Sequence, residues 1–371
     1  MELGQLLSIM GQHPWLIIAF LTIFGVLFVN GWSDAPNAIS TCISTKAMRV
    51  ESALIMAAIM NFLGLFTMFF ISTKVAETIQ EMITFNGTWG SYELTMDQCD
   101  TALKVISTAM FSVVMFGVVA SIIGIPSSET HALIGGLVGS GLGALVIGKT
   151  DVLINWSFDF WQPLGKVVYG LLISCLFGFF VGFLMTKLIL LICHNMNRNH
   201  TRPFFKWAQI VSGGSLAFVH GAQDGMQFVG VSFLALQIAA MYGGITIDSN
   251  FFNAGHLWYL GLACATVIGI GTLCGGKKII KKVAMSMTKL EPYEGFATDL
   301  SSAIGIFIAT CFGFPISTSQ VKAFAILGAG ASKGLNKVKW STVGEMVLTW
   351  VCTFPGSGLF GFLASLILLS F

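Results

Sequence analysis

The chain has 371 residues, of which 55% are hydrophobic and only 10% are charged. A soluble globular domain carries about a quarter charged residues, so this composition excludes an ordinary soluble protein and indicates a polytopic membrane protein. The net charge of +2 is too small to indicate a nucleic-acid partner. The eight cysteines form no C-x-x-C pair and no metal-ligand spacing, so we expect neither a disulfide framework nor a cofactor.

The apolar segments predict an all-α fold. A membrane-spanning helix needs about 20 apolar residues. Two shorter stretches, 127–148 and 316–330, are rich in Gly and Ser and each is preceded by a proline, which favours re-entrant helical hairpins or half-helices over simple spans. The segments that meet or approach the full length are 14–46 (interrupted), 50–73, 102–124, 163–193, 206–242 (interrupted), 253–275, 299–312 and 341–370.

The charged loops predict the orientation, because lysine and arginine accumulate on the cytoplasmic side of a membrane protein. Basic clusters lie at 194–206, at 277–282 and, more weakly, at 45–49, and we expect all three in the cytoplasm. The acidic loop 74–100 and the stretch 242–253, which has no Lys or Arg, are expected outside. This pattern predicts a multi-pass protein of the plasma (inner) membrane with both termini extracellular or periplasmic.

Two polar motifs occur twice in the chain. VNGWSDAPNA (29–38) matches VHGAQDGMQF (219–228) at an offset of 190 residues, and GIPSSETHALIGG (124–136) matches GFPISTSQVKAFA (313–325) at an offset of 189. The segments that carry the first motif cross the membrane in opposite directions in the predicted topology. We therefore expect an inverted-topology repeat with broken helices, of residues 1–193 and 206–371, joined by a basic cytoplasmic linker at 194–205. Such repeats build secondary transporters with a site at the bilayer midplane.

The first motif predicts a cation site at Asp34 and Asp224. An ionised aspartate in hydrocarbon costs about 3 kcal/mol or more, so both must face the protein interior or water. Pro36 removes a backbone donor, so the helix should unwind near 31–36 and free its carbonyl oxygens. These oxygens, the carboxylate and the Asn37 amide suit a hard cation such as Na⁺. The alternative is a helix kink around a buried, neutral aspartate.

The second motif predicts an oxyanion site. Proline fits the first turn of a helix, Ser and Thr suit its cap, and the free N–H groups that follow attract an anion. The alternative is ordinary Ser/Thr contact between membrane helices. His131, Gln320 and Lys322 lie within or beside the motif and are auxiliary candidates. The hydroxyl donors are Ser127, Ser128, Thr130, Ser317, Thr318 and Ser319.

The two motifs together predict cation-coupled symport of a small oxyanion. Two carboxylates alone would repel an anion, and an oxyanion without a cation would be too costly in the membrane. No G-x-x-x-x-G-K-[ST] motif occurs, so the energy should come from an ion gradient. An ion channel remains an alternative, since broken helices also line pores. No nucleophile elbow or metal-ligand cluster supports an enzyme.

The four motifs resemble those of the inorganic phosphate transporter (PiT) family over almost the whole chain. That family carries two G-A-N-D-x-A-N-A-like signatures, here at 30–38 and 220–227, and P-x-S-S/T-T-H-like hairpin motifs, here at 126–132 and 315–321. The resemblance implies a prokaryotic inverted-repeat transporter, commonly a homodimer in the lipid bilayer, that moves inorganic phosphate with Na⁺ or H⁺. Some members move sulfate, so sulfate or another tetrahedral oxyanion is the alternative substrate.

The resemblance also assigns roles to residues. Asp34, Asn37, Asp224 and Gln227 take signature positions linked to cation and phosphate binding, and the hydroxyls from Ser128 to Thr130 and from Ser317 to Ser319 take the phosphate positions. The first Asn of the signature is Ser33 in one copy and Gln223 in the other, Glu129 replaces a Ser or Thr, and Gln320 replaces the His kept as His131. These departures change the polar ligands, among them Gln223 at the cation site, and leave the choice between Na⁺ and H⁺ open.

Overall fold

The computed structural model describes residues 3–85, 95–124, 127–149, 152–154, 159, 161–242, 255–275 and 289–370. Within this part of the chain, seven helices are long and apolar enough to cross a membrane, which confirms an all-α, polytopic fold. The helices are α1 (Leu3–Gln12), α2 (Pro14–Ser33), α3 (Ala35–Ser44), α4 (Val50–Ile71), α5 (Lys74–Gln80), α6 (Met96–Ile123), α7 (Glu129–Val146), α8 (Pro163–Ile192), α9 (Arg198–Tyr242), α10 (Trp258–Cys274), α12 (Pro292–Phe312), α13 (Thr318–Ala331) and α14 (Trp340–Leu369).

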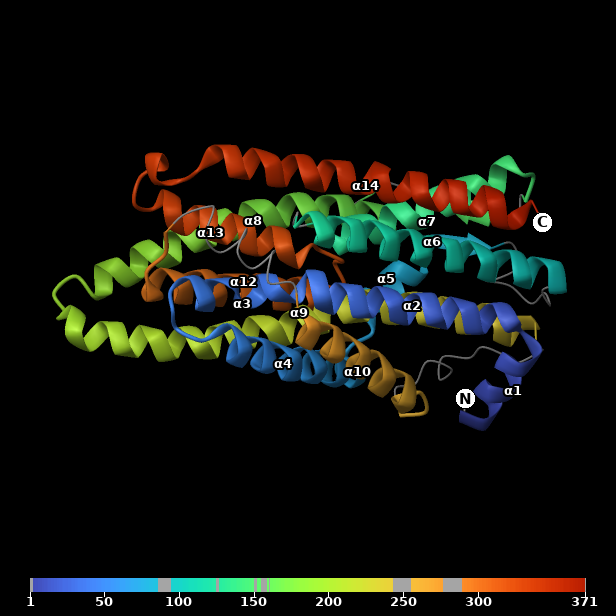
Figure 1. Cartoon of the computed structure of the whole chain (residues 1–371), viewed down its shortest axis with the longest axis horizontal. Helices are drawn as coiled ribbons and strands as arrows, with labels where there is room; N and C mark the ends of the chain where they lie inside the picture. Colours follow the sequence, from blue (N-terminus) through green and yellow to red (C-terminus); the bar gives the residue numbers. More distant parts are fainter. Residues whose placement is uncertain are drawn as a thin grey trace.

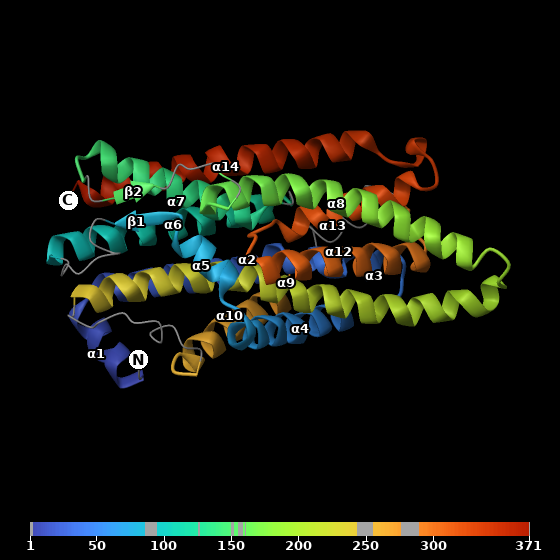
Figure 2. The same ribbon diagram turned by 180° about the vertical axis from the view of Figure 1, so that it is seen from behind.

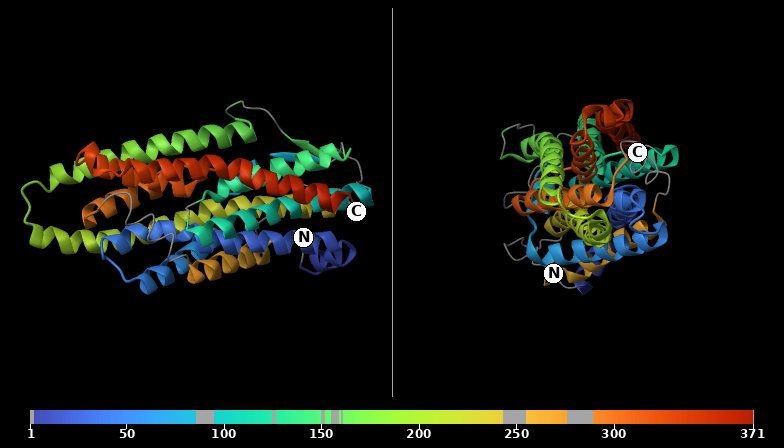
Figure 3. Two further views of the ribbon diagram at one scale, coloured as in Figure 1. Left: turned by 45° about the horizontal axis from the view of Figure 1, so that its top comes forward. Right: turned by 90° about the vertical axis from the view of Figure 1, so that its left-hand side faces the viewer.

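The long helices lie side by side along one axis of the molecule (Figure 1). Both termini lie at one end of this axis, and the turn between α8 and α9 lies at the other (Figures 1 and 3). A two-stranded antiparallel ladder, β1 (Ile83–Phe85) with β2 (Val152–Ile154), lies beside α6 and α7 near the C-terminus (Figure 2). The basic cluster 277–282, residues 243–253 of the second outer loop and residues 86–94 of the first are outside the described residues.

The first predicted interruption is present but short. α2 ends at Ser33 and α3 begins at Ala35, so only Asp34 separates the two helices. Its backbone N–H still donates to Asn30 O at 2.8 Å. Pro36, in the first turn of α3, has no N–H and therefore breaks the hydrogen-bond ladder here. The predicted unwinding over residues 31–36 is therefore wrong in extent, because the break is confined to one residue.

The second predicted interruption is wrong, because α9 runs for 45 residues through Asp224 without a break. The sequence explains the difference: Met226 stands at the position equivalent to Pro36, so no backbone donor is lost. The flanking Gly225 weakens a helix by only about 1 kcal/mol relative to alanine, and tertiary packing overrides this cost. The first turns of α9 also take up residues 198–205 of the predicted linker, which leaves a short turn after α8.

The predicted re-entrant segments 127–148 and 316–330 are single helices, α7 and α13, rather than hairpins of their own. Each forms a helical hairpin with the helix before it, α6–α7 and α12–α13. The first arm of each ends at a glycine in the left-handed region, Gly124 (φ 77°) and Gly313 (φ 74°), where a side chain would be strained. The second arm of each begins after a serine N-cap, Ser128 and Ser317. As predicted, a helix N-terminus follows the start of each Ser/Thr cluster.

The helices of the two halves of the chain pack in matching pairs. α2 packs on α6 as α9 packs on α12, and α4 packs on α9 as α10 packs on α2. α14 packs on the first hairpin through α7, and α8 packs on the second through α13. α2–α3 and α9 cross in opposite directions, since Asn30 contacts Asp224 whereas Thr45 contacts Gln209. Each half therefore covers the hairpin of the other.

Candidate substrate and cation site

The tips of the two hairpins touch at the centre of the bundle. Ser128 Oγ donates to Ser317 Oγ at 2.9 Å, and both residues are buried. Each serine also caps its own helix, because Ser128 Oγ accepts from the N–H of His131 at 3.3 Å and Ser317 Oγ accepts from that of Gln320 at 3.4 Å. The N-termini of α7 and α13 thus point at a shared place, and the partial positive charges of both helix ends add there.

Asp34 and Asp224 lie beside the second tip and are 3% and 2% exposed. Asp34 Oδ1 accepts from Asn37 Nδ2 at 2.8 Å and from Ser319 Oγ. Asp224 Oδ2 accepts from Thr318 Oγ1 at 3.1 Å. Two consecutive hydroxyls at the start of α13 therefore contact one carboxylate from each half of the chain.

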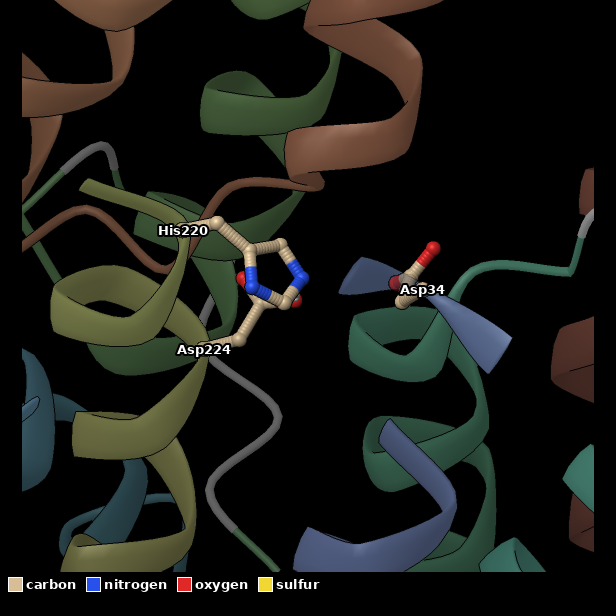
Figure 4. Close-up of side chains that lie close together, drawn as sticks. All are labelled: Asp34, His220 and Asp224. Carbon is tan, nitrogen blue, oxygen red and sulfur yellow. Dashed lines mark ion pairs between the residues drawn. The ribbon is translucent and has the colours of Figure 1, made fainter. Parts of the chain in front are cut away.

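His220 completes this group of carboxylates. Its Nε2 lies 3.3 Å from Asp224 Oδ2, and its Nδ1 lies 2.7 Å from Asn61 Oδ1. Ligand atoms of Asp34, His220 and Asp224 all lie within 4.8 Å of one another, close enough to hold one cation among them. Figure 4 shows the imidazole over the Asp224 carboxylate on α9, with Asp34 facing both from the break after α2.

Three polar residues at this site were not assigned from the sequence. Asn30 Nδ2 donates to Asp224 Oδ2 at 3.2 Å. Asn30 and His220 occupy equivalent positions of the repeated motif, one turn before Asp34 and Asp224, and this spacing was a usable signal. Asn61 lies in the apolar segment of α4, away from every motif, and nothing in the sequence pointed to it.

The two glutamines of the second signature hold the hairpin tips. Gln227 Nε2 donates to Thr130 Oγ1 at 3.2 Å and to Ile316 O at 3.4 Å. Gln223 Nε2 donates to Phe314 O at 2.9 Å, and its Oε1 accepts from Thr310 Oγ1 at 2.5 Å. Gln227 therefore links the two hairpins, whereas the described contacts of Gln223 are with the second hairpin rather than with either aspartate.

The other predicted residues lie around this centre. Ser127 is buried next to the first tip. His131 is half-buried, and its Nδ1 has no hydrogen-bond partner among the described residues. Gln320 Oε1 accepts from Cys175 Sγ at 3.8 Å, so its side chain is directed at α8. Lys322 is buried and pairs with Asp299.

The site is closed. A cavity of only about 10 Å³ adjoins it, lined by Asn37, Ala38, Leu216, His220, Thr318 and Lys322. This space has room for about one water molecule, so a larger oxyanion can enter only if the hairpin tips separate. Chemically, the site offers hydroxyl and amide donors for an anion and clustered carboxylate oxygens for a cation or a proton.

Comparison with known proteins identifies the family of the chain. A probable low-affinity inorganic phosphate transporter of Bacillus subtilis (strain 168) is 33% identical over 95% of this chain and 98% of that protein. One of Rhizobium meliloti (strain 1021), with the same name, is 31% identical over 90% of both chains. A solved structure of a protein named "The sodium-dependent phosphate transporter" shares the fold, with a TM-score of 0.79 and 21% identity over 96% of this chain and 100% of that one. The model of the phosphate transporter family matches residues 30–361, and the chain belongs to this family.

Proposed function

We propose that the protein imports inorganic phosphate by symport with a cation. The observation that carries this proposal is the contact between the two hydroxyl-lined helix N-termini, the second of which also contacts two buried carboxylates, one from each half of the chain. The names of the relatives support phosphate as the substrate. An ion gradient supplies the energy, and the protein is a transporter rather than an enzyme.

Phosphate binds between the hairpin tips. Its oxygens replace the hydrogen bond between Ser128 and Ser317 and accept from the hydroxyls and the free N–H groups that begin α7 and α13. Asn37 Nδ2 lies 3.4 Å from Ser319 Oγ and adds an amide donor at the edge of the second tip. The full set is Ser127, Ser128, Thr130, Ser317, Thr318 and Ser319, with Asn37 and Gln227.

The coupling cation binds at Asp34 and Asp224. Asn37 and Asn30 supply amide groups beside the carboxylates, and the tip hydroxyls of Ser319 and Thr318 reach the same oxygens. A cation here offsets the negative charge of the phosphate a few ångströms away. The sodium dependence in the name of the similar solved transporter favours Na⁺ over H⁺ for this ion.

The two halves form an inverted-topology repeat that gives alternating access. The matching helix pairs and the opposite crossing of α2–α3 and α9 support the repeat. Each hairpin tip closes one route to the shared site, so separation of the tips toward one side or the other exposes the phosphate to that side. Both termini face the outside and the α8–α9 turn faces the cytoplasm.

Uptake of labelled phosphate into proteoliposomes tests the proposal. A Na⁺ gradient and a pH gradient are imposed separately, and sulfate is added as a competitor. We expect saturable uptake driven by the Na⁺ gradient and resistant to sulfate. Uptake blocked equally by both anions would point to a general oxyanion carrier, and non-saturating, uncoupled flux would point to a channel.

Substitution of either carboxylate tests the cation site. Asp34→Asn and Asp224→Asn keep the side-chain volume but remove the charge that binds the cation, so we expect coupled uptake to fall at least about 100-fold, as when a buried charged partner is lost. Asp97→Asn is the matched control, because Asp97 is exposed and pairs with Lys149 at the end of the bundle. Wild-type uptake in both site variants would refute the cation role.

A further inference from the structure

A third carboxylate, Glu129, is buried at the first hairpin tip. Glu129 is the first residue of α7, lies between the tip residues Ser128 and Thr130, and is 1% exposed. Its Oε1 lies 2.9 Å from Ser33 Oγ, at the last residue of α2 before the break. The equivalent residue in the second half is Thr318, so only one half carries this group.

The hydrogen-bond distances around Ser33 fit a proton on Glu129. Ser33 Oγ lies 2.7 Å from Val29 O and 2.9 Å from Glu129 Oε1. A serine hydroxyl has one proton and can donate to only one of these oxygens, while both distances are those of hydrogen bonds. A neutral Glu129 resolves the conflict: its carboxylic acid donates to Ser33 Oγ, and Ser33 donates to Val29 O.

The other carboxylate oxygen supports the same protonation state. Glu129 Oε2 is buried and has no hydrogen-bond partner among the described residues. An ionised carboxylate with an unpartnered buried oxygen is very costly, whereas the carbonyl oxygen of an acid is much less so. A metal ion fits less well, since a hard cation such as Ca²⁺ takes about six to eight oxygen ligands, whereas the described partner of the Glu129 carboxyl group is one hydroxyl.

The charges that face Glu129 are negative. Asp34 directly follows Ser33, the partner of Glu129, and Asp224 lies on α9 with His220 as its partner. On its own helix α7 the other titratable group is the half-buried His131. α6 carries Asp97, Asp100 and Lys104 in its first turns, far from Gly117, which lies next to Glu129, and α14 carries Glu345 in its second turn. β1 and β2 carry no titratable side chain.

We propose that Glu129 is a proton carrier of the transport cycle. The inference rests on the proposed symport of phosphate and adds to it a proton site separate from the cation site at Asp34 and Asp224. With the proton bound, the acid ties the first hairpin to the end of α2. When the tip moves away from Ser33 and opens to the cytoplasm, water reaches the carboxyl group and accepts its proton. The carboxylate that remains takes up a proton from the outer side when the site next opens there.

The test measures protons and phosphate together. Proteoliposomes that hold a pH-sensitive dye are given a Na⁺ gradient and labelled phosphate, and the ratio of protons to phosphate is compared between the wild type and Glu129→Gln. The amide of the variant keeps a hydrogen-bond donor toward Ser33 but cannot release a proton. We therefore expect the ratio of protons to phosphate to fall by about one, because one carboxyl group binds one proton. Glu51→Gln, at an exposed position in the first turn of α4, is the matched control and should leave the ratio unchanged.

A second readout covers a Glu129→Gln variant that does not transport. The infrared spectrum of the folded, resting wild type should contain a protonated carboxylic-acid band that the variant lacks and that Glu51→Gln retains. An unchanged proton ratio, or an unchanged infrared band in a variant that does not transport, overturns the inference and leaves the symporter standing. Absence of phosphate uptake by the wild type under every gradient overturns both.

Discussion

At the scale of single residues, Lys322 differs most from its predicted role. The sequence predicted Lys322 to be an auxiliary residue of the anion site. In the structure its ammonium group is buried against Asp299 and lies 3.0 Å from Thr41 Oγ1. The equivalent positions in the first half hold Leu133 and Met110, both buried. The ion pair therefore joins α13, α12 and α3 on one side of the site. On the other side, the equivalent positions hold apolar residues.

Removal of one partner of this pair should destabilise the protein strongly. Lys322→Leu leaves Asp299 buried without a counter-charge, which costs about 3–5 kcal/mol, whereas the double variant Lys322→Leu/Asp299→Met adopts the apolar pair of the first half and should recover most of the loss. Thermal unfolding in detergent measures both, with the exposed Lys339→Met as control. A double variant as unstable as the single one would show that the pair is not replaceable.

The same scale shows what the sequence can and cannot predict about the site. Asp34 and Asp224 were predictable because a carboxylate is rare in an apolar segment. Their equivalent positions in two copies of one motif strengthened the prediction. The contact of Ser319 with Asp34 and of Thr318 with Asp224 was not, because it depends on how α13 is rotated against α3 and α9. Asn61 was not predictable either, since one amide in an apolar helix has no visible partner until α4 packs on α9.

At the scale of elements, each hairpin is held by close contact between backbones. A Cβ atom added at Gly139 of α7 would overlap the backbone of Gly358 on α14, and one added at Gly182 of α8 would overlap that of Ala325 on α13. Small residues at helix crossings allow this approach in membrane proteins. Glycine-rich composition predicted such crossings in general, but the partner of each glycine was not predictable, because the pairs join opposite halves of the chain.

Gly139→Ala should weaken the crossing of α7 and α14. The added methyl group meets backbone atoms that cannot rotate away, and such overpacking costs about 1–3 kcal/mol. Gly344→Ala, on α14 with open space around its Cβ position, is the control and should be neutral or stabilise the helix by up to about 1 kcal/mol. Thermal unfolding of the two variants makes the comparison, and equal midpoints would contradict the close approach.

At the scale of the whole molecule, the proposed transport cycle predicts that the two hairpins separate. Ser128→Cys/Ser317→Cys places two thiols where two hydroxyls lie 2.9 Å apart, in a background without the exposed Cys274 and Cys352. Oxidation should stop phosphate uptake by locking the tips, and a reducing agent should restore it. Either single cysteine variant is the control. Continued uptake by the oxidised, crosslinked protein would refute movement of the tips.

The orientation of the molecule in the membrane is testable by labelling. Cysteines are introduced singly at Gly4, near the N-terminus, and at His200, in the first turn of α9 at the opposite end of the bundle. A membrane-impermeant maleimide should label the Gly4→Cys variant in intact cells and the His200→Cys variant only after lysis. Labelling in the reverse order would invert the proposed topology.

Because each half of the chain covers the hairpin of the other half, the packing also constrains the order in which the protein can fold during synthesis. Ser357 Oγ of α14 donates to Ala132 O of α7 across 225 residues of chain, so the first hairpin lacks its main partner until the last helix has been synthesised. During translation, the face of α7 that carries Gly139 therefore contacts lipid or the insertion machinery until α14 is present. A ribosome that stops before α14 therefore leaves a polypeptide with most of its spans inserted but with α7 lacking its main packing partner.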